Sequence, residues 1–166
     1  ADIIRRLQGF AATRLEDSIG PIDVNALVHD AVTLTRGLWK DEAEARGVRI
    51  EVTTDLEAAP AVRGNAAELR EVVTNLVLNA IDAMPRGGQL GLSTRPRGGG
   101  VELTVTDTGE GMSEEVRRRI FEPFFSTRSP LRTGLGLSVV HGTVGRHRGR
   151  VEVTSEEGRS TTVRVW

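Results

Sequence analysis

Hydrophobic residues recur along the chain with two periods, one typical of helices and one typical of strands. Helical spacing within residues 1–16 predicts the end of a longer helix, which the sequence SIGP at 18–21 breaks. A second helix is expected from Asn25 to about Arg46, with Asp23 or Asn25 as its N-cap and Gly47 at its C-terminal stop.

A third helix is the longest apolar one. Asn65 followed by Glu68 three positions later forms a capping signature, and the helix is expected to run to Met84, where PRGG stops it. Further on, a short helix is expected to open at Ser113, and residues 137–147 read as one more helix.

Strict alternation of apolar and polar residues predicts the strands. They are expected at 48–55, 89–95 and 101–107, and at 150–155 with 160–166 as a closing antiparallel hairpin. Strands gathered late in the chain, with helices between them in an open order, predict an α+β two-layer sandwich and not a doubly wound sheet.

Composition excludes several classes of function. The 166 residues suit one domain, and 22 basic against 23 acidic residues leave no electrostatic footprint for nucleic acid. The absence of cysteine excludes disulfides, thiol nucleophiles and Cys-based zinc sites. No apolar run approaches the roughly 20 residues needed to span a bilayer, so we expect a soluble cytoplasmic domain without membrane contact. Because the chain lacks an initiator Met, a longer parent protein is expected.

A polar stripe runs along the third helix within NLVLNAIDAM (75–84) and the turn before it. Glu71, Asn75, Asn79 and Asp82 follow one another at spacings of four, four and three, so they share one side of an otherwise apolar helix. Two interpretations stay open at this point. The stripe faces water, or its amide oxygens face a hard cation or a phosphate-bound water.

The hexapeptide DTGEGM (107–112) follows directly after a predicted strand. Gly109 and Gly111 allow positive φ and a close approach of the backbone to a ligand. Asp107 is then a fixed acceptor, which suits the exocyclic amine of adenine and repels the carbonyl of guanine. A plain Asp-Gly turn is the equally weighted alternative.

Two further segments are suggestive only in combination. The sequence TGLGLS (133–138) opens a helix and could present backbone N–H groups to phosphates, although it lacks the Lys-Ser or Lys-Thr pair of a Walker loop. Before it, the polar segment 121–132 carries Phe121, Phe124 and Phe125, which are interpreted as hydrophobic latches of a lid or as local core packing.

Together these motifs resemble the sensor histidine kinases and, more widely, the ATPase superfamily that they share with gyrase, the MutL proteins and the heat-shock 90 chaperones. NLVLNAIDAM is similar to the N box, DTGEGM to the first glycine box, FEPFFST to the phenylalanine box and TGLGLSVV to the second glycine box. The resemblance implies a Bergerat-type two-layer α/β sandwich, with a mixed, mostly antiparallel sheet and helices on one face. It makes 1–16 the stub of a dimerisation helix and 17–166 the ATP-binding catalytic domain, with an ATP lid at about 113–133.

The resemblance also implies residue roles. Asn79 would coordinate Mg²⁺, with Asn75 near the same ion and Asp82 among the nucleotide-binding residues. Asp107 would accept from adenine N6, Thr161 would help to hold an adenine-bound water, and Arg128 would bind the γ-phosphate. The adenine wall and the phosphate cradle would be formed by Gly109, Gly111 and Met112, and by Thr133, Gly134, Leu135, Gly136 and Leu137.

The chain departs from the family pattern in several places. Arg132 stands where the second glycine box often has an extra Gly, and Ser160 replaces the second Gly of the last box. Hydrolysing relatives carry a Glu base at the position of Asn75, and an amide cannot accept a proton at neutral pH. An Asn there favours a site that holds ATP for transfer.

The phosphoacceptor histidine of the family is expected to lie upstream of this chain. None of the three histidines has the right context: His29 reads as a partly buried helix residue, His141 as helix packing, and His147 as a helix C-terminal residue whose charge would suit the dipole.

The predicted activity is transfer of the γ-phosphoryl group of Mg-ATP to a histidine on a dimerisation domain absent from this chain. The expected partners are ATP, that phosphoacceptor domain and a response-regulator receiver domain, in a homodimeric parent whose membrane attachment is open. The alternatives are an ATP hydrolase of the gyrase and MutL kind, and a non-catalytic nucleotide-binding regulatory module.

Overall fold

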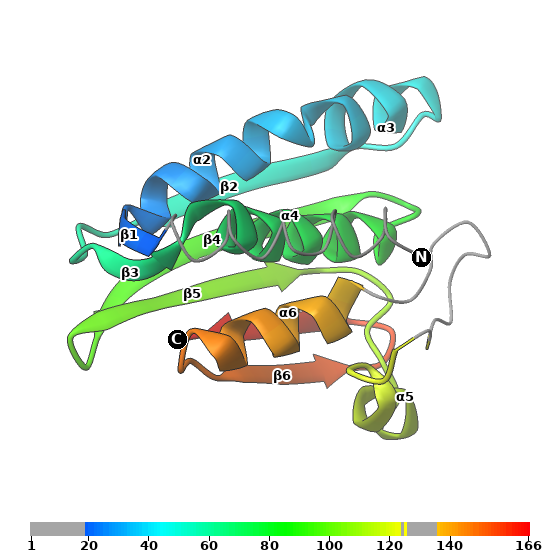
Figure 1. The fold of residues 1–166 in the computed structure, drawn as a ribbon. Helices are drawn as coiled ribbons and strands as arrows, with labels where there is room; N and C mark the ends of the chain where they lie inside the picture. The colour runs from blue at the N-terminus through cyan, green and yellow to red at the C-terminus, as the bar shows by residue number, and fades with distance from the viewer. Residues whose placement is uncertain (1–18, 124, 126–135) are drawn as a thin grey trace, which may run out of the picture.

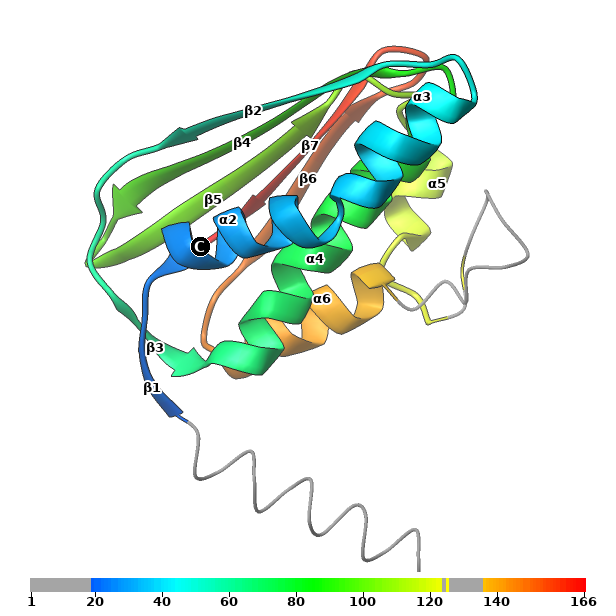
Figure 2. The same ribbon diagram turned by 90° about the horizontal axis from the view of Figure 1, so that it is seen from above.

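Helices α2, α4 and α6 lie side by side across one face of a five-stranded sheet, with α4 in the middle (Figures 1 and 2). The computed structural model describes residues 19–123, 125 and 136–166. The helical segments are α2 (Val24–Leu34), the π-helical η1 (Gly37–Glu42), α3 (Ala43–Ala45), α4 (Ala66–Asp82), α5 (Glu114–Arg119) and α6 (Gly136–Arg146). The predicted helix end at 1–16 lies outside the described residues, as do residues 124 and 126–133 of the segment assigned to the lid.

The main sheet has the strand order β2-β4-β5-β7-β6. Its strands are β2 (Ile50–Leu56), β4 (Gly88–Arg97), β5 (Gly100–Asp107), β7 (Ser160–Val165) and β6 (Val151–Glu156). The β2–β4 pair is parallel and the other three pairs are antiparallel. The expected α+β sandwich with a mixed, mostly antiparallel sheet and helices on one face is confirmed.

Alternation along the central strands sends one set of side chains into the core. Leu90 and Leu92 of β4 and Leu103 and Val105 of β5 are buried beneath the helices, and Val77 of α4 is fully buried against the same core. Burial of apolar side chains on one face of each strand is what holds a half-covered sheet to its helices. The opposite face is polar and open.

The predicted N-caps are confirmed. The Asp23 side chain accepts from Asn25 N and Ala26 N at the start of α2, and Asn65 Oδ1 accepts from Glu68 N at 3.0 Å at the start of α4. Ser113 caps α5 by accepting from Val116 N. These side chains satisfy N–H groups that have no partner inside the helix.

The second predicted helix is interrupted, which corrects the expectation of one helix from Asn25 to Arg46. α2 ends at Leu34, and a π-helical segment follows. The Thr35 hydroxyl donates to Ala31 O at 2.7 Å, and the Trp39 indole donates to Val32 O at 3.1 Å. Side-chain donors thus bond carbonyls of the last α-helical turn, and the backbone continues with wider turns.

A small second sheet was also missed. Strand β1 (Ile19–Ile22), within the region where the sequence indicated only a break, pairs antiparallel with β3 (Val62–Asn65). This ribbon leads directly into the N-cap of α4 (Figure 2).

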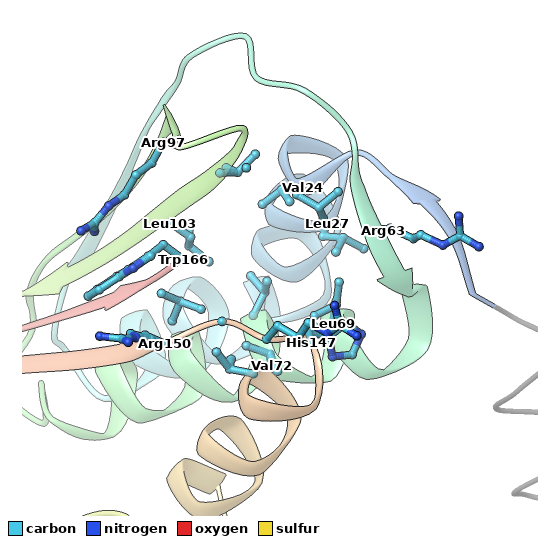
Figure 3. A pocket seen from close by; sticks show the side chains of 18 of the residues that line it. Val24, Leu27, Arg63, Leu69, Val72, Arg97, Leu103, His147, Arg150 and Trp166 are labelled. Carbon is cyan, nitrogen blue, oxygen red and sulfur yellow. The ribbon is translucent and has the colours of Figure 1, made fainter.

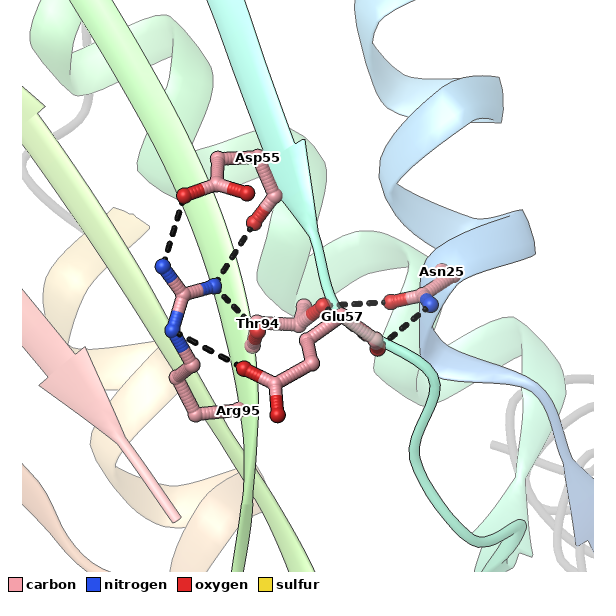
Figure 4. Close-up of polar contacts among 5 residues, drawn as sticks. All are labelled: Asn25, Asp55, Glu57, Thr94 and Arg95. Carbon is pink, nitrogen blue, oxygen red and sulfur yellow. Dashed lines mark hydrogen bonds and ion pairs between the residues drawn. The ribbon is translucent and has the colours of Figure 1, made fainter.

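A polar cluster fixes the start of α2 to the edge of the sheet (Figure 4). Thr94, fully buried on β4, donates to Asn25 Oδ1 at 2.6 Å, and Asn25 Nδ2 donates to Glu57 O at 3.0 Å. Arg95 bonds Asp55 at 2.6 Å and Glu57 at 3.2 Å, and its hydrogen bond with Asp55 raises the pKa of the guanidinium. Strand β2, the chain after it and helix α2 are therefore tied together by side chains.

Across the described ranges, no helix combines the length and the apolar character that crossing a membrane requires.

Candidate functional site

A small cavity lies between the helix layer and the sheet, toward the C-terminal end of α4. Its volume is about 60 Å³. The polar side chains Asn79, Asp107 and Thr161 line it, together with Met112, Leu137 and six apolar core residues. Five of the predicted site residues, contributed by α4, β5, the loop after β5, α6 and β7, therefore meet in one place.

Asp107 and Thr161 form the sheet side of this cavity. Both are buried, at 4 % and 7 % exposure, and they are register partners on the antiparallel strands β5 and β7. Asp107 Oδ1 accepts from Gly109 N at 2.9 Å, which closes the turn after β5. A buried carboxylate held by its own turn is a fixed acceptor at the end of the strand.

Ser155 of β6 completes the polar edge, and sequence reasoning missed it. Its hydroxyl lies 2.8 Å from Thr161 Oγ1, donates to Ser160 O and accepts from Met112 N at 2.8 Å. The predicted hairpin placed both residues at its closed end, and the structure makes Ser155 and Thr161 register partners. Ser155 thus connects Thr161 to Met112 in the loop after β5.

The two glycines act through the backbone. A Cβ on Gly109 would collide with Ala83 O, the carbonyl that accepts from Glu110 N at 2.8 Å. Gly111 has φ +64°, and a Cβ there would collide with Glu156 O. The loop is therefore packed between the end of α4 and the β6–β7 turn, at a distance that only glycine permits.

Asn79 lines the helix side of the cavity with an unusual amide. Its Nδ2 atom is buried and, within the described part of the chain, has no hydrogen-bond partner. A Cβ on Gly136, the first residue of α6, would lie 3.5 Å from both Nδ2 and Oδ1. A half-turn about the Cβ–Cγ bond exchanges these two atoms. Since an orphaned buried polar group is costly, this amide is a candidate for holding a ligand.

Not every member of the polar stripe reaches the cavity. Asn75 and Asp82 are half-buried on α4 but are not among the residues that line it, and Glu71 is exposed. Thr133, Gly134, Leu135 and Arg128 lie outside the described residues, as do Arg132 and Phe124. The structure therefore brings together part of the predicted set.

Two of the three phenylalanines of the lid segment are described. The Phe121 ring contacts the ring of His141 on α6, with centroids 4.8 Å apart, and the Arg119 guanidinium lies 4.4 Å from the centre of Phe125. The segment after α5 thus contacts α6 through Phe121.

Two of the three histidine expectations need correction. His29 is exposed on α2 and not partly buried. His141 is exposed on α6 and packs on Phe121 in the segment after α5. His147 Nε2 accepts from Asn65 N at 3.1 Å, while Nδ1 lies 2.8 Å from Thr143 O and must donate to it. Both ring nitrogens of His147 thus contact backbone groups, one at the N-cap of α4 and one in α6.

Comparison with known proteins gives a consistent picture. The family model described as histidine kinase-, DNA gyrase B-, and HSP90-like ATPase matches residues 64–166. The sensor histidine kinase ZraS of Escherichia coli K12 is 33 % identical over 145 residues, covering 87 % of this chain and 30 % of the relative. The sensor-like histidine kinase SenX3 of Mycolicibacterium smegmatis is 35 % identical over 164 residues, covering 96 % of this chain and 40 % of the relative. The chain thus spans 30 % to 40 % of the length of these relatives.

Solved structures agree with this match. The mycobacterial sensor histidine kinase MprB superposes with a TM-score of 0.74 at 26 % identity, covering 88 % of this chain and 94 % of that one. Full-length ShkA in complex with AMPPNP superposes with a TM-score of 0.75 at 26 % identity, covering 89 % of this chain and 30 % of that one.

Proposed function

Because this chain belongs to the family of histidine kinase-, DNA gyrase B- and HSP90-like ATPases, we propose that it binds Mg-ATP and donates the γ-phosphoryl group to a histidine outside this chain. One observation carries the proposal. A single cavity is bordered by a buried carboxylate–threonine pair and by an amide whose Nδ2 atom has no partner among the described residues.

The sheet side of the cavity suits adenine. The Asp107 carboxylate would accept from the exocyclic amine, while guanine would bring a carbonyl oxygen to the same place and be repelled. The Thr161 hydroxyl would hold a water against the ring, and Met112 and Leu137 would cover its faces. At about 60 Å³ the cavity is far smaller than the roughly 300–1,000 Å³ of typical ligand sites. The ring would therefore enter as these two apolar side chains move apart.

The helix side suits phosphates and a metal ion. Asn79 would offer its amide oxygen to Mg²⁺, a cation that prefers oxygen ligands and is often shared between protein and phosphate groups. The bound ion would neutralise charge on the β- and γ-phosphates. Gly136 and Leu137 lie in the first described turn of α6, with Gly136 beside Asn79. Their backbone N–H groups would face the phosphate chain with the positive end of the helix dipole.

The residues around the site favour phosphoryl transfer over hydrolysis. Asp107 is the one carboxylate among the residues that line the described cavity, and it serves the turn after β5. Asn75 cannot take a proton from water, and Glu71 lies two turns, or roughly 12 Å along the axis, before Asn79. Without a general base, attack by water loses a factor of roughly 10²–10⁴. ATP would thus persist until an acceptor arrives.

The wider setting is part of the proposal. Residues 1–16 would end a dimerisation helix, and 17–166 would form the catalytic domain of a homodimeric cytoplasmic or membrane-attached kinase. Arg128, in a lid at about 113–133, would bind the γ-phosphate, and Asp82 and Thr133–Leu135 would complete the nucleotide contacts. The phosphorylated histidine would then supply a response-regulator receiver domain.

The decisive experiment is calorimetric titration with ATP and GTP, with and without Mg²⁺, on the wild type and on Asp107→Asn. We expect the wild type to bind ATP but not GTP, and to need Mg²⁺ for this binding. We expect Asp107→Asn to lose it. Asn keeps an oxygen for Gly109 N, so the turn should survive. Equal binding of the two nucleotides would overturn the adenine assignment. A chain extended upstream to the acceptor histidine that binds ATP yet never becomes phosphorylated would favour the regulatory module.

A further inference from the structure

A second cavity lies at the opposite end of the same helix layer (Figure 3). Its volume is about 380 Å³, within the roughly 300–1,000 Å³ typical of small-molecule sites. α4 contributes Leu69 and Val72, which precede Asn79 by two to three helical turns. The cavity therefore does not overlap the proposed nucleotide site.

The floor of this cavity is apolar. Val24 and Leu27 of α2, Leu69 and Val72 of α4, and Leu103 of β5 surround it, and the Trp166 indole lies at one side (Figure 3). Such a surface gains free energy when apolar groups of a ligand cover it. An apolar body of moderate size would fit.

Four arginines are among the residues that line the cavity: Arg63, Arg97, Arg148 and Arg150. Arg97 and Arg150 flank the Trp166 ring in Figure 3, and the Arg97 guanidinium lies 3.9 Å from the ring centre. Arg97 is already paired with Glu102 at 2.6 Å. Among the described residues, Arg148 and Arg150 have no ion pair, whereas Arg63 points away from the cavity. Two positive charges at its border are thus left without a carboxylate.

Arg148 occupies a conformation that arginine rarely adopts. Its φ is +59°, the one positive φ outside glycine in the described part of the chain. Arg148 N donates to Gly145 O and Gly149 N donates to Val144 O, which is the Schellman pattern that ends α6. Glycine is preferred at this position because it has no Cβ, so an arginine there has a less favourable backbone conformation. Strain at a non-glycine residue beside a cavity is a pointer to function.

We propose that this cavity binds a free organic carboxylate with an apolar body. The body would rest on the Val, Leu and Trp floor, and the carboxylate would be held by Arg148 and Arg150. Guanidinium groups bind carboxylates through two parallel hydrogen bonds, which gives direction as well as strength. The proposal is independent of nucleotide binding.

The test uses decanoate as the probe and Trp166 as the reporter. The chain has two tryptophans, so Trp39→Phe leaves Trp166 as the single indole. We expect a saturable change of its fluorescence with decanoate and none with decyltrimethylammonium, which has an equally long chain and the opposite charge. Similar responses to both, or no saturable response to decanoate, would overturn the proposal.

Two variants in the same background test the arginines. Arg148→Gly and Arg150→Gln should each weaken decanoate binding roughly tenfold or more, whereas Arg159→Gln, in the exposed β6–β7 turn, should not change it. Because glycine suits the φ of position 148, that variant should unfold at the same or a higher temperature than its parent. Loss of binding then cannot be ascribed to misfolding. Unchanged affinity in Arg148→Gly and Arg150→Gln would refute the proposed carboxylate contacts.

Discussion

Asp107 and Thr161 lie opposite each other on neighbouring antiparallel strands, and both point into the buried side of the sheet. Core positions of a strand are normally apolar, and this pair follows Leu103 and Val105 in the same alternation. The pair therefore places two polar groups at the one point where the core meets the small cavity. The pair therefore determines from which side of the cavity adenine would be contacted.

Thr161→Val is expected to lower ATP affinity about five- to tenfold, since one hydrogen-bonding group worth roughly 1 kcal/mol is removed while the shape is kept. Ser155 retains Met112 N and Ser160 O as partners, so the fold should persist. Thr162→Val is the matched control, because Thr162 bonds Thr106 on the open face. Calorimetry compares the two, and equal losses would argue against a specific role for Thr161.

Asn79→Ala is expected to abolish the Mg²⁺ dependence of ATP binding. The same change removes a side chain whose buried Nδ2 atom has no partner within the described ranges, so its cost to the free energy of unfolding should stay below about 1 kcal/mol. Denaturant unfolding of the apo chain measures the second quantity. Unchanged Mg²⁺ dependence would show that the amide is structural.

Asn75→Glu would install a carboxylate one turn before Asn79. If the missing base is what protects ATP, phosphate release by the isolated chain should rise by at least a factor of ten, toward the roughly 10²–10⁴ that such catalysis supplies. Asn75→Gln has the same length without a base and serves as the control. A phosphate-release assay that finds no increase for the Glu variant would mean that absence of a base is not the limiting factor.

Gly109→Ala should destabilise the domain by about 2–3 kcal/mol or more, because the new Cβ meets the Ala83 carbonyl inside a packed loop. Gly158→Ala provides the comparison. Gly158 also needs a special conformation, with φ +77°, but a Cβ there would meet nothing within 4 Å, so about 1 kcal/mol is expected. Similar unfolding midpoints for the two variants would contradict the close-packing argument.

Thr94→Val should cost about 1–2 kcal/mol of unfolding free energy. The substitution leaves Asn25 Oδ1 without the hydroxyl that bonds it at 2.6 Å, at a fully buried position. Thr53→Val, exposed on β2, is the control and should be nearly neutral. A small effect at Thr94 would show that water replaces the hydroxyl.

Local patterns predicted most of the fold because caps and alternation are encoded in adjacent residues. Asn65 with Glu68 located the start of α4, and the apolar–polar alternation in 101–107 located β5. The β1–β3 ribbon could not be predicted in this way. Its first strand is four residues long and contains Gly20 and Pro21, so only pairing with a distant segment makes it a strand.

The small cavity was partly predictable and the large one was not. Helical spacing placed Asn75, Asn79 and Asp82 on one side of α4, but it does not determine which of them a cavity reaches. The large cavity takes its lining from helices, strands and turns spread along the chain, including Arg148, whose conformation no local pattern indicated. Three-dimensional packing alone brings these groups together.

Helices α4 and α6 and strands β5 and β7 each border both cavities, one near each end. Leu137 and Val144 belong to the same short helix, as Val72 and Asn79 belong to the same long one. Thermodynamic linkage then applies to the two cavities as a pair. If an occupant of one cavity changes the free energy of binding in the other, the second occupant changes the free energy of binding in the first by the same amount. The coupling can therefore be measured at either cavity.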